Sequence, residues 1–177
     1  MPLEPPRFEA IEMLRALAHR RVDYVLIGGL AAVLHGSPTF TNDADICPRR
    51  TRDNLERLAT ALRDMSAKIR TDAEPEGLAF ACDAPFLERM KMVNLQTTYG
   101  WFDISFEPGG FPGGYEELVE HAIEYPVDDF VVLVASLHDV IASKEAANRT
   151  KDQAVLPYLY ALEDEIAALE REQHRGG

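Results

Sequence analysis

The sequence predicts an α/β (α+β) fold in which a mixed, twisted sheet is flanked by helices and followed by a C-terminal helical segment. Helical and strand periodicities alternate along most of the chain. The candidate strands are short runs rich in apolar and β-branched residues, and glycine- and proline-containing turns separate the elements. Because 177 residues suffice for one core but not for two full domains, we expect a single domain over residues 1–177, with an α/β core over about 1–134 and helices over about 135–177.

The elements of the first half are justified by their periodicity and their end signals. They are a helix around 8–17, a buried strand over 22–27, a short helix over 30–35, a strand over 43–47 and a helix over about 52–62. The first strand ends in Gly28-Gly29, and the turn residues Gly36-Ser37-Pro38 end the short helix. Thr51 is expected to cap the helix that follows it.

The second half continues the alternation and ends in helices. It contains an acidic loop over 72–76, a hairpin of 91–97 with 101–106, a helix around 115–121, a strand over 130–134, a helix to about 148 and a last helix to about 173. Ser136 with Asp139, and Thr150 with Gln153, have the spacing of capping boxes. Pro157 predicts a kink or a restart in the last helix.

The composition is that of an ordinary soluble globular protein. Apolar residues make up 46% of the chain and charged residues 27%, which excludes a disordered polymer. No apolar run is long enough to span a bilayer, and the first six residues lack the features of a signal peptide, so we expect a cytoplasmic protein with no membrane partner. Cys47 and Cys82 have no CxxC spacing and are expected to be reduced and buried.

The net charge of −12 argues against broad binding to a nucleic-acid backbone, because such binding draws its free energy from many lysine and arginine contacts. Any contact with nucleic acid must therefore be local. Residues 19–21 (His-Arg-Arg) and the group Arg49, Arg50 and Arg52 are candidates for such a contact. Both groups are also typical of solvated helix ends, so both interpretations stay open.

Acidic residues on two predicted strands are the main candidates for chemistry. Asp43 and Asp45 are two residues apart and project from the same face of a strand, so together they can hold a hard divalent cation. Asp103 lies in the middle of a later strand. Gly28 and Gly29 have no Cβ and let backbone N–H groups approach a phosphate. Purely structural interpretations also remain open. The acids can be solvated residues on edge strands, and the turn can need glycine only for its geometry.

The order of a strand, a Gly-Gly turn, a short helix, an Asp-x-Asp strand and a third aspartate resembles the DNA polymerase β superfamily of nucleotidyltransferases. The resemblance implies that Gly28 and Gly29 hold the triphosphate of an NTP, and that Asp43, Asp45 and Asp103 bind two magnesium (or manganese) ions. Physical chemistry agrees, because nucleotidyl transfer builds up negative charge on phosphate oxygens, and two divalent ions about 3.5–4 Å apart can neutralise it.

Residues 137–144 and 149–152 resemble the tail of the AbiEii branch of this superfamily, whose members include bacterial toxins that modify tRNA with nucleotides. By this resemblance Lys144 contacts phosphate and takes part in catalysis, Lys151 neutralises phosphate, and Asp152 supports the nucleotide site. By sequence alone the two lysines are ordinary surface residues. The resemblance implies transfer of a nucleoside monophosphate to a hydroxyl of RNA, such as the 3′ end of tRNA, or of a protein, by the toxin of a toxin–antitoxin pair with an antitoxin partner.

Two further hypotheses are kept. Gly29 stands where many members of the superfamily have serine, and the short helix after the turn holds no lysine, so the chain can also be a catalytically inactive nucleotide-binding or regulatory module. In a third hypothesis the domain is purely structural and the acids are surface residues.

Overall fold

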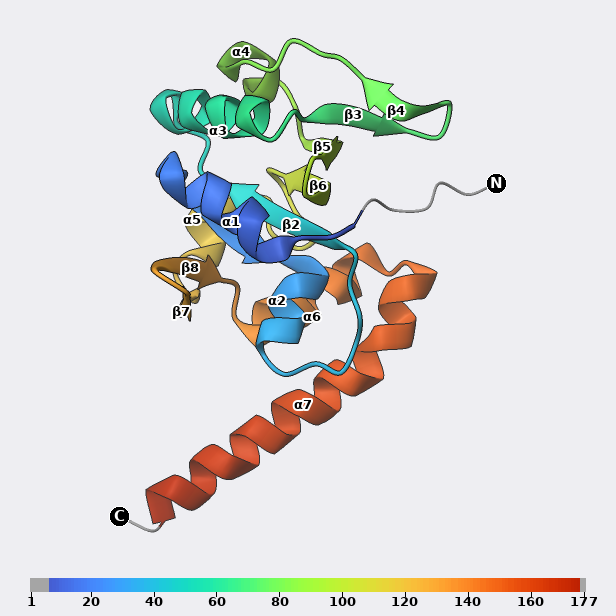
Figure 1. Cartoon of the computed structure of the whole chain (residues 1–177). Coiled ribbons are helices and arrows are strands. Elements are labelled where there is room, and N and C mark those ends of the chain that lie inside the picture. Colours follow the sequence, from blue (N-terminus) through green and yellow to red (C-terminus); the bar gives the residue numbers. More distant parts are fainter. Residues whose placement is uncertain (1–6, 176–177) are drawn as a thin grey trace.

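Eight strands form one mixed sheet in this computed structural model, which describes residues 7–175 (Figure 1). The strands are β1 (Tyr24–Ile27), β2 (Asp43–Pro48), β3 (Lys68–Thr71), β4 (Glu74–Leu78), β5 (Met92–Thr97), β6 (Gly100–Ser105), β7 (Ile123–Val127) and β8 (Phe130–Val134). The helices are α1 (Ala10–His19), α2 (Gly28–Leu34), α3 (Arg52–Asp64), α4 (Ala84–Glu88), α5 (Tyr115–Leu118), α6 (Leu137–Ala147) and α7 (Thr150–Arg175). The first six residues, over which no signal peptide is expected, lie outside the described range.

Strand β2 lies in the interior of the sheet and connects the glycine turn with the acidic residues. The strand order is β4-β3-β5-β6-β2-β1-β8-β7. β2 pairs antiparallel with β1 and parallel with β6, so Asp45 is opposite Ile27 on one side and opposite Asp103 on the other. Because Gly28 follows Ile27 directly, this register brings the turn next to Asp45, with Asp103 on the strand beyond it. The interpretation of the acids as edge-strand residues is wrong, because β2 and β6 each have a neighbour on both sides.

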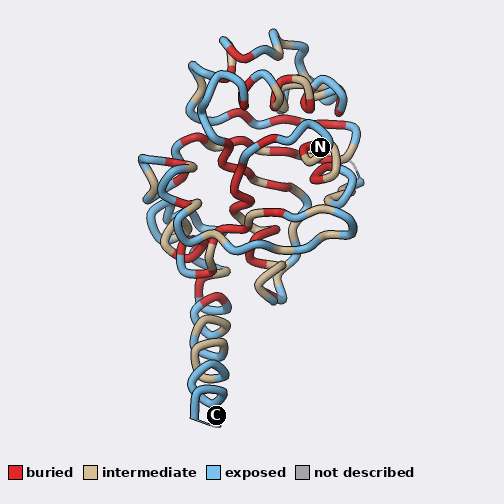
Figure 2. The backbone as a smooth tube through the Cα atoms, turned by 90° about the vertical axis from the view of Figure 1, so that its left-hand side faces the viewer, coloured by how far each residue is buried: buried red, intermediate tan, exposed pale blue. Residues whose placement is uncertain are grey.

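The other side-chain face of β2 and β6 belongs to the hydrophobic core. Side chains alternate along a strand, so Ala44 and Ile46 point away from the face that carries the acids, as do Phe102 and Ile104. All four are fully buried. Apolar residues of α1 and α3 join the same core, and these two helices contact each other. Figure 2 shows the buried segments gathered inside the body. Each large apolar side chain buried here contributes about 1.5–3 kcal/mol, which holds the acid-bearing strands in place.

The predicted fold class is confirmed, and the predicted hairpin is present as β5 and β6. The expected loop over 72–76 is partly wrong because β4 occupies its second half, and β7 was not expected. Most side chains of these two strands are exposed or half-buried, so they lack the apolar alternation by which strands are predicted. The helix expected over 115–121 ends at Leu118. Thr51 precedes α3, but its side chain makes no capping hydrogen bond.

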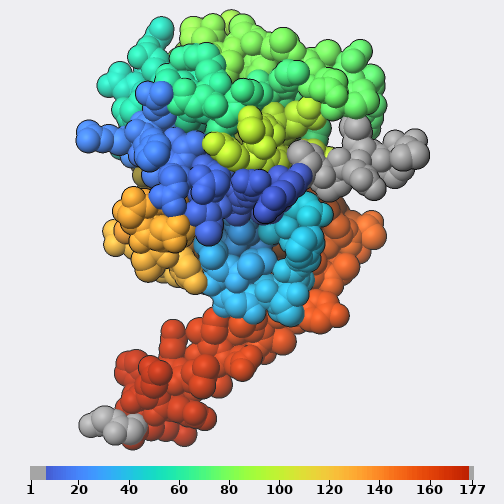
Figure 3. Space-filling view, in the orientation of Figure 1, coloured from blue at the N-terminus to red at the C-terminus, as the bar shows by residue number. Residues whose placement is uncertain are grey.

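The C-terminal helices differ from expectation in their details. Ser136 caps α6 as predicted, because its Oγ accepts a hydrogen bond from the backbone N–H of Asp139 at 3.1 Å. α7 continues through Pro157 as one helix, so no restart occurs there. α7 begins at Thr150, and the side chain of Gln153, expected to form a capping box with Thr150, instead donates to Oδ1 of Asn148 at 2.8 Å. The second half of α7 projects from the body (Figures 1 and 3). Across residues 7–175, no helix combines the length and the apolar character needed to cross a membrane.

Candidate active site

The three predicted acids lie on one face of two neighbouring strands. Asp43 and Asp45 are two residues apart on β2, and Asp103 on β6 is the direct cross-strand partner of Asp45. Neighbouring strands are about 4.8 Å apart, so these carboxylates repel one another at short range. All three residues are partly buried, which strengthens the repulsion because less water screens it.

Burial and mutual repulsion raise the pKa values of two of the acids. Burial is the main cause for Asp45, and the charges of Asp43 and Asp103 add to it, so its pKa rises to about 7. Burial also raises the pKa of Asp103, although the charge and the hydrogen bonds of Arg70 oppose the shift. The protein therefore leaves part of the negative charge of this cluster uncompensated, which is a condition that favours a bound cation.

The Gly28-Gly29 turn packs directly against Asp45. Gly28 has a φ of +68°, in the left-handed region that favours glycine, and a Cβ at this position would collide with the carboxylate of Asp45. At Gly29, a Cβ would lie 3.0 Å from Oγ1 of Thr41. A side chain is thus excluded at Gly28 and only tightly accommodated at Gly29, so the backbone itself forms the wall of the site.

Two adjoining cavities open beside the acids, and together we call them the cleft. The glycine-side cavity has a volume of about 330 Å³ and is lined by Gly28, Gly29, Ala32, Thr39, Phe40, Thr41, Asn42, Asp43, Asp45, Trp101, Lys144, Arg149, Lys151, Asp152 and Val155. The Arg70-side cavity has a volume of about 430 Å³ and is lined by Ile27, Gly28, Asp45, Arg70, Met92, Asn94, Asp103, Ile104, Ser105, Pro108, Gly109, Val140, Ser143, Lys144, Ala147, Arg149 and Lys151. The cavities share Asp45, and every predicted site residue lines at least one of them. The roles assigned to these residues stay predictions.

A buried carboxylate holds two cations at the junction of α6 and α7. Asp152 is fully buried, and its carboxylate accepts from Nε of Arg149 at 2.7 Å and lies 3.5 Å from Nζ of Lys144. Burial acts to raise the pKa of Asp152, but the hydrogen bonds and the charge of Arg149 outweigh it, and the pKa is lowered. Asp152 therefore fixes the position of Lys144, which lines both cavities. Lys151 is exposed and also lines both cavities. Its positive charge partly offsets the rise in the pKa of Asp45.

Arg70 on β3 is a site residue that we did not predict. Its Nη2 lies 2.9 Å from both carboxylate oxygens of Asp103, and its guanidinium stacks on the ring of Trp101 at 4.5 Å. The two residues are 33 positions apart, and no motif links them. Only the strand order β3-β5-β6 brings them within reach of each other.

The fit of the acids to a divalent cation depends on these partners. Within residues 7–175, no group of three or more histidine, cysteine or acidic side chains is arranged to hold a metal ion. Two of the three acids already have a partner: Arg70 pairs with Asp103, and the hydroxyl of Thr41 donates to Oδ1 of Asp43 at 2.8 Å. Asp43 and Asp45 share a face and line the same cavity, so they fit one divalent cation. Arg70 lies against both oxygens of Asp103, so it competes with a cation for this carboxylate.

Phe40 is a second residue that sequence reasoning missed. It lies in the connection between α2 and β2, lines the glycine-side cavity and is 88% exposed. A large aromatic side chain left in water beside a cavity is available for stacking on a ligand. No periodic pattern predicts such a residue, because it belongs to a loop.

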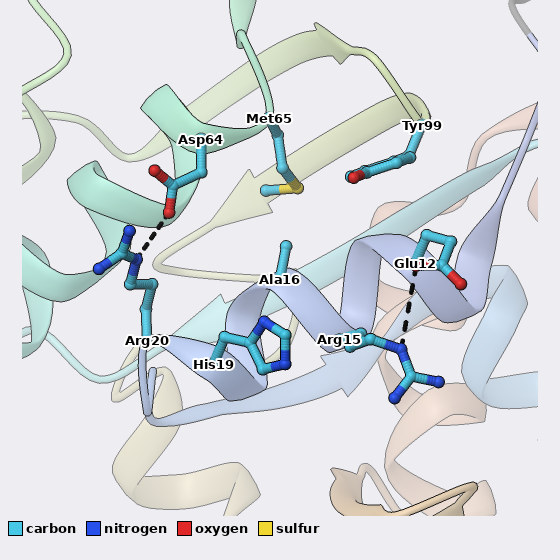
Figure 4. Close-up of a pocket in the computed structure, with 8 residues that line it drawn as sticks. All are labelled: Glu12, Arg15, Ala16, His19, Arg20, Asp64, Met65 and Tyr99. Atoms are coloured by element: carbon cyan, nitrogen blue, oxygen red, sulfur yellow. Dashed lines mark hydrogen bonds and ion pairs between the residues drawn. The ribbon is translucent and has the colours of Figure 1, made fainter.

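The basic groups singled out in the sequence lie outside the cleft. Arg49 pairs with Glu116 at 2.8 Å, and Arg50 donates to two backbone carbonyl groups. A separate cavity has a volume of about 370 Å³. Its lining residues come from α1, the end of α3 and the turn between β5 and β6 (Figure 4). There Arg20 pairs with Asp64 at 2.6 Å, and Arg15 pairs with acids of the β7–β8 turn. These arginines are neutralised by neighbours, which favours the structural interpretation.

The fold has counterparts among solved structures. One is the lincosamide antibiotic adenylyltransferase LnuA with lincomycin bound, at 16% identity and a TM-score of 0.58, over 89% of this chain and 99% of that chain. Another is the antibiotic-resistance factor ANT(2'')-Ia, at 14% identity and a TM-score of 0.52, over 93% and 94%. At these identities the likeness concerns the fold alone, so this chain has a nucleotidyltransferase fold. No family model and no curated protein sequence matches the chain.

Proposed function

We propose that the protein is a magnesium-dependent nucleotidyltransferase, which moves a nucleoside monophosphate from an NTP to a hydroxyl group; manganese is the alternative ion. The observation that carries the proposal is the convergence of Asp43, Asp45 and Asp103 beside the Gly28-Gly29 turn, in a chain with a nucleotidyltransferase fold. Strands distant in sequence bring these groups together at an interior position of the sheet, where the repulsion of three acids needs compensation.

We assign the NTP to the glycine-side cavity. There the phosphates meet bare backbone at Gly28 and Gly29, with Lys144 and Lys151 as the neighbouring cations. Phe40 offers a face on which the base can stack. The acceptor is assigned to the Arg70-side cavity, onto which Asp103 opens. Asp45 lines both cavities and marks the boundary at which the α-phosphate would react.

The chemistry follows from this arrangement. The acceptor oxygen forms a bond to the α-phosphorus, the bond to the bridging oxygen of pyrophosphate breaks, and pyrophosphate leaves. Asp103 is the carboxylate placed on the acceptor side to take up the hydroxyl proton. Lys144, positioned by Asp152, balances charge on the leaving pyrophosphate. Asp43 and Asp45 would hold the divalent cation, which neutralises the charge that develops on the phosphate oxygens.

For the acceptor we propose an RNA hydroxyl at the 3′ end of tRNA, and for the biological setting a cytoplasmic toxin that an antitoxin protein neutralises. The support is the resemblance of residues 137–152 to the AbiEii tail, because the fold alone does not choose an acceptor. With a net charge of −12, contact with RNA is confined to a small area around the cleft cations Arg70, Arg149 and Lys151. A protein hydroxyl is the competing acceptor.

The test is label transfer from each α-labelled NTP, with magnesium, to separated fractions of cellular RNA and protein. We expect labelled tRNA with the native protein and at least a hundredfold loss with Asp43→Asn and with Asp45→Asn. Asp53→Asn is the matched control, since Asp53 is an exposed acid in the first turn of α3. Unchanged labelling in both cleft variants would remove these acids from the mechanism, and label on protein alone would change the acceptor.

Two observations favour a second function, that of a nucleotide-binding module without catalysis. The third acid, Asp103, is occupied by Arg70, and Gly29 replaces the serine that many members of the superfamily have. Calorimetry with NTP and magnesium separates the hypotheses when combined with label transfer. Binding without transfer supports the module, and no binding at all supports a purely structural domain.

A further inference from the structure

Arg70 neutralises an acid that the proposed reaction requires. One guanidinium nitrogen forms the ion pair, since Nη2 lies 2.9 Å from both oxygens of Asp103. Both side chains are largely buried, with exposed fractions of 19% and 18%, so water screens the pair weakly. The Nη1 atom of Arg70 is buried and has no hydrogen-bond partner. The guanidinium thus donates to both oxygens of Asp103, while its Nη1 hydrogens have no acceptor.

The charges around the cleft show why a cation is needed at this place. Four carboxylates line the cleft or lie at its wall: Asp43, Asp45, Asp103 and Asp152. Four cations face them: Arg70, Lys144, Arg149 and Lys151. Asp152 is paired with two of these cations, Lys144 and Arg149. Of these four cations, Arg70 is the one in direct contact with a member of the acid cluster, and that member is Asp103.

We propose that Arg70 is a positioning residue that occupies the place of a divalent cation at Asp103. In the metal-free protein it holds the Asp103 carboxylate against the repulsion of Asp43 and Asp45. A divalent ion that uses Asp103 as a ligand must displace the guanidinium, and the stack on Trp101 gives Arg70 a second contact to retain. Arg70 thereby lowers the affinity of the cleft for free metal ions. The inference rests on the proposed function for its purpose, since Asp103 lies beside the two acids that would hold the divalent cation of that reaction.

The test is the affinity for Mn²⁺ in the absence of nucleotide. It is measured by calorimetry and, independently, by the electron paramagnetic resonance signal of free Mn²⁺. Arg70→Gln should bind Mn²⁺ at least tenfold more tightly than the native protein. Asp103→Asn alone should change the affinity less than threefold, because Arg70 already occupies that carboxylate. In the double variant Arg70→Gln/Asp103→Asn the tenfold gain should vanish. Arg70→Lys keeps the charge and should stay close to the native affinity.

A matched control and a second readout protect the test against misfolding. Arg52→Gln removes an exposed arginine outside the cleft and should leave Mn²⁺ affinity unchanged. In chelator, Arg70→Gln should unfold at a lower temperature than the native protein, and added Mn²⁺ should raise its unfolding temperature by a larger amount. These two shifts appear only in a folded variant whose acids have lost a cation.

Two results would overturn the inference. One is an Mn²⁺ affinity of Arg70→Gln equal to or below that of the native protein, and the other is a gain that persists without Asp103. Neither outcome depends on label transfer. If the native protein transfers label and the affinity does not rise, only the role of Arg70 fails. If the affinity rises through Asp103 and no label is transferred, the proposed function fails and the role of Arg70 stands.

Discussion

Gly28 offers the sharpest test of how the turn and the acids fit together. Replacing Gly28 by alanine places a methyl group where the Asp45 carboxylate lies, on a backbone with a φ of +68°. The left-handed conformation costs an alanine about 1–2 kcal/mol. Forcing a methyl group against a packed neighbour costs about 1–3 kcal/mol more. Asp45 cannot move freely, because β2 is paired on both sides. We therefore expect Gly28→Ala to lower the free energy of unfolding by about 2–5 kcal/mol.

The assay is urea unfolding followed by far-ultraviolet circular dichroism, with Gly29→Ala as the matched control. At Gly29 the new methyl group meets Oγ1 of Thr41 at 3.0 Å, but the backbone is not left-handed, and alanine favours the first turn of α2 by up to about 1 kcal/mol. The two effects nearly cancel, so this control should change stability by less than about 1 kcal/mol. Equal effects at the two positions would refute the reasoning, because they would show that the Asp45 contact and the positive φ carry no cost.

Three further predictions concern the cleft. The pKa of Asp45 rises to about 7 on folding, so the native state holds the proton more tightly than the unfolded chain. In chelator, the free energy of unfolding should therefore fall as pH rises from about 4 to 7, by up to about 4 kcal/mol. Urea unfolding at pH 5 and pH 8 measures this, and Asp45→Asn should flatten the profile. Phe40→Ala should leave stability within about 0.5 kcal/mol and weaken NTP binding by about 1–3 kcal/mol in calorimetry, whereas unchanged affinity would remove the stacking role. Asp152→Asn should destabilise the protein by about 1.5–3 kcal/mol in urea unfolding, because Lys144 and Arg149 lose a charged hydrogen-bond partner. A change below about 0.5 kcal/mol would contradict this.

Local pattern was enough to predict the centre of the fold. The apolar run before Gly28 and the alternation of Phe102 and Ile104 with Asp103 identify β1 and β6, because these strands bury one or both faces. The acids are found by the same periodicity, since a spacing of two on a strand puts them on one face. By contrast, β4 and β7 are mostly exposed or half-buried, so no apolar alternation distinguishes them from loops.

Contacts set by strand order were beyond reach of the sequence. Arg70 meets Asp103 only because β5 places β3 near β6, and a sequence does not reveal that order from spacing. The pairing of Lys144 with Asp152 depends on the turn at Asn148, whose φ of 49° reverses the chain between α6 and α7. The resemblance pointed to both residues, but only the structure shows that Asp152 holds Lys144 in place.

The balance of charge in the cleft bears on how an NTP arrives. The protein carries a net charge of −12, so a free triphosphate is repelled at long range. Its site offers no excess of positive charge, because Arg70, Lys144, Arg149 and Lys151 are matched by as many carboxylates. The divalent cation must therefore supply the surplus that the triphosphate needs. It follows that metal and nucleotide should bind as a complex, with each raising the affinity for the other, and that nucleotide binding in chelator should be weak at any salt concentration.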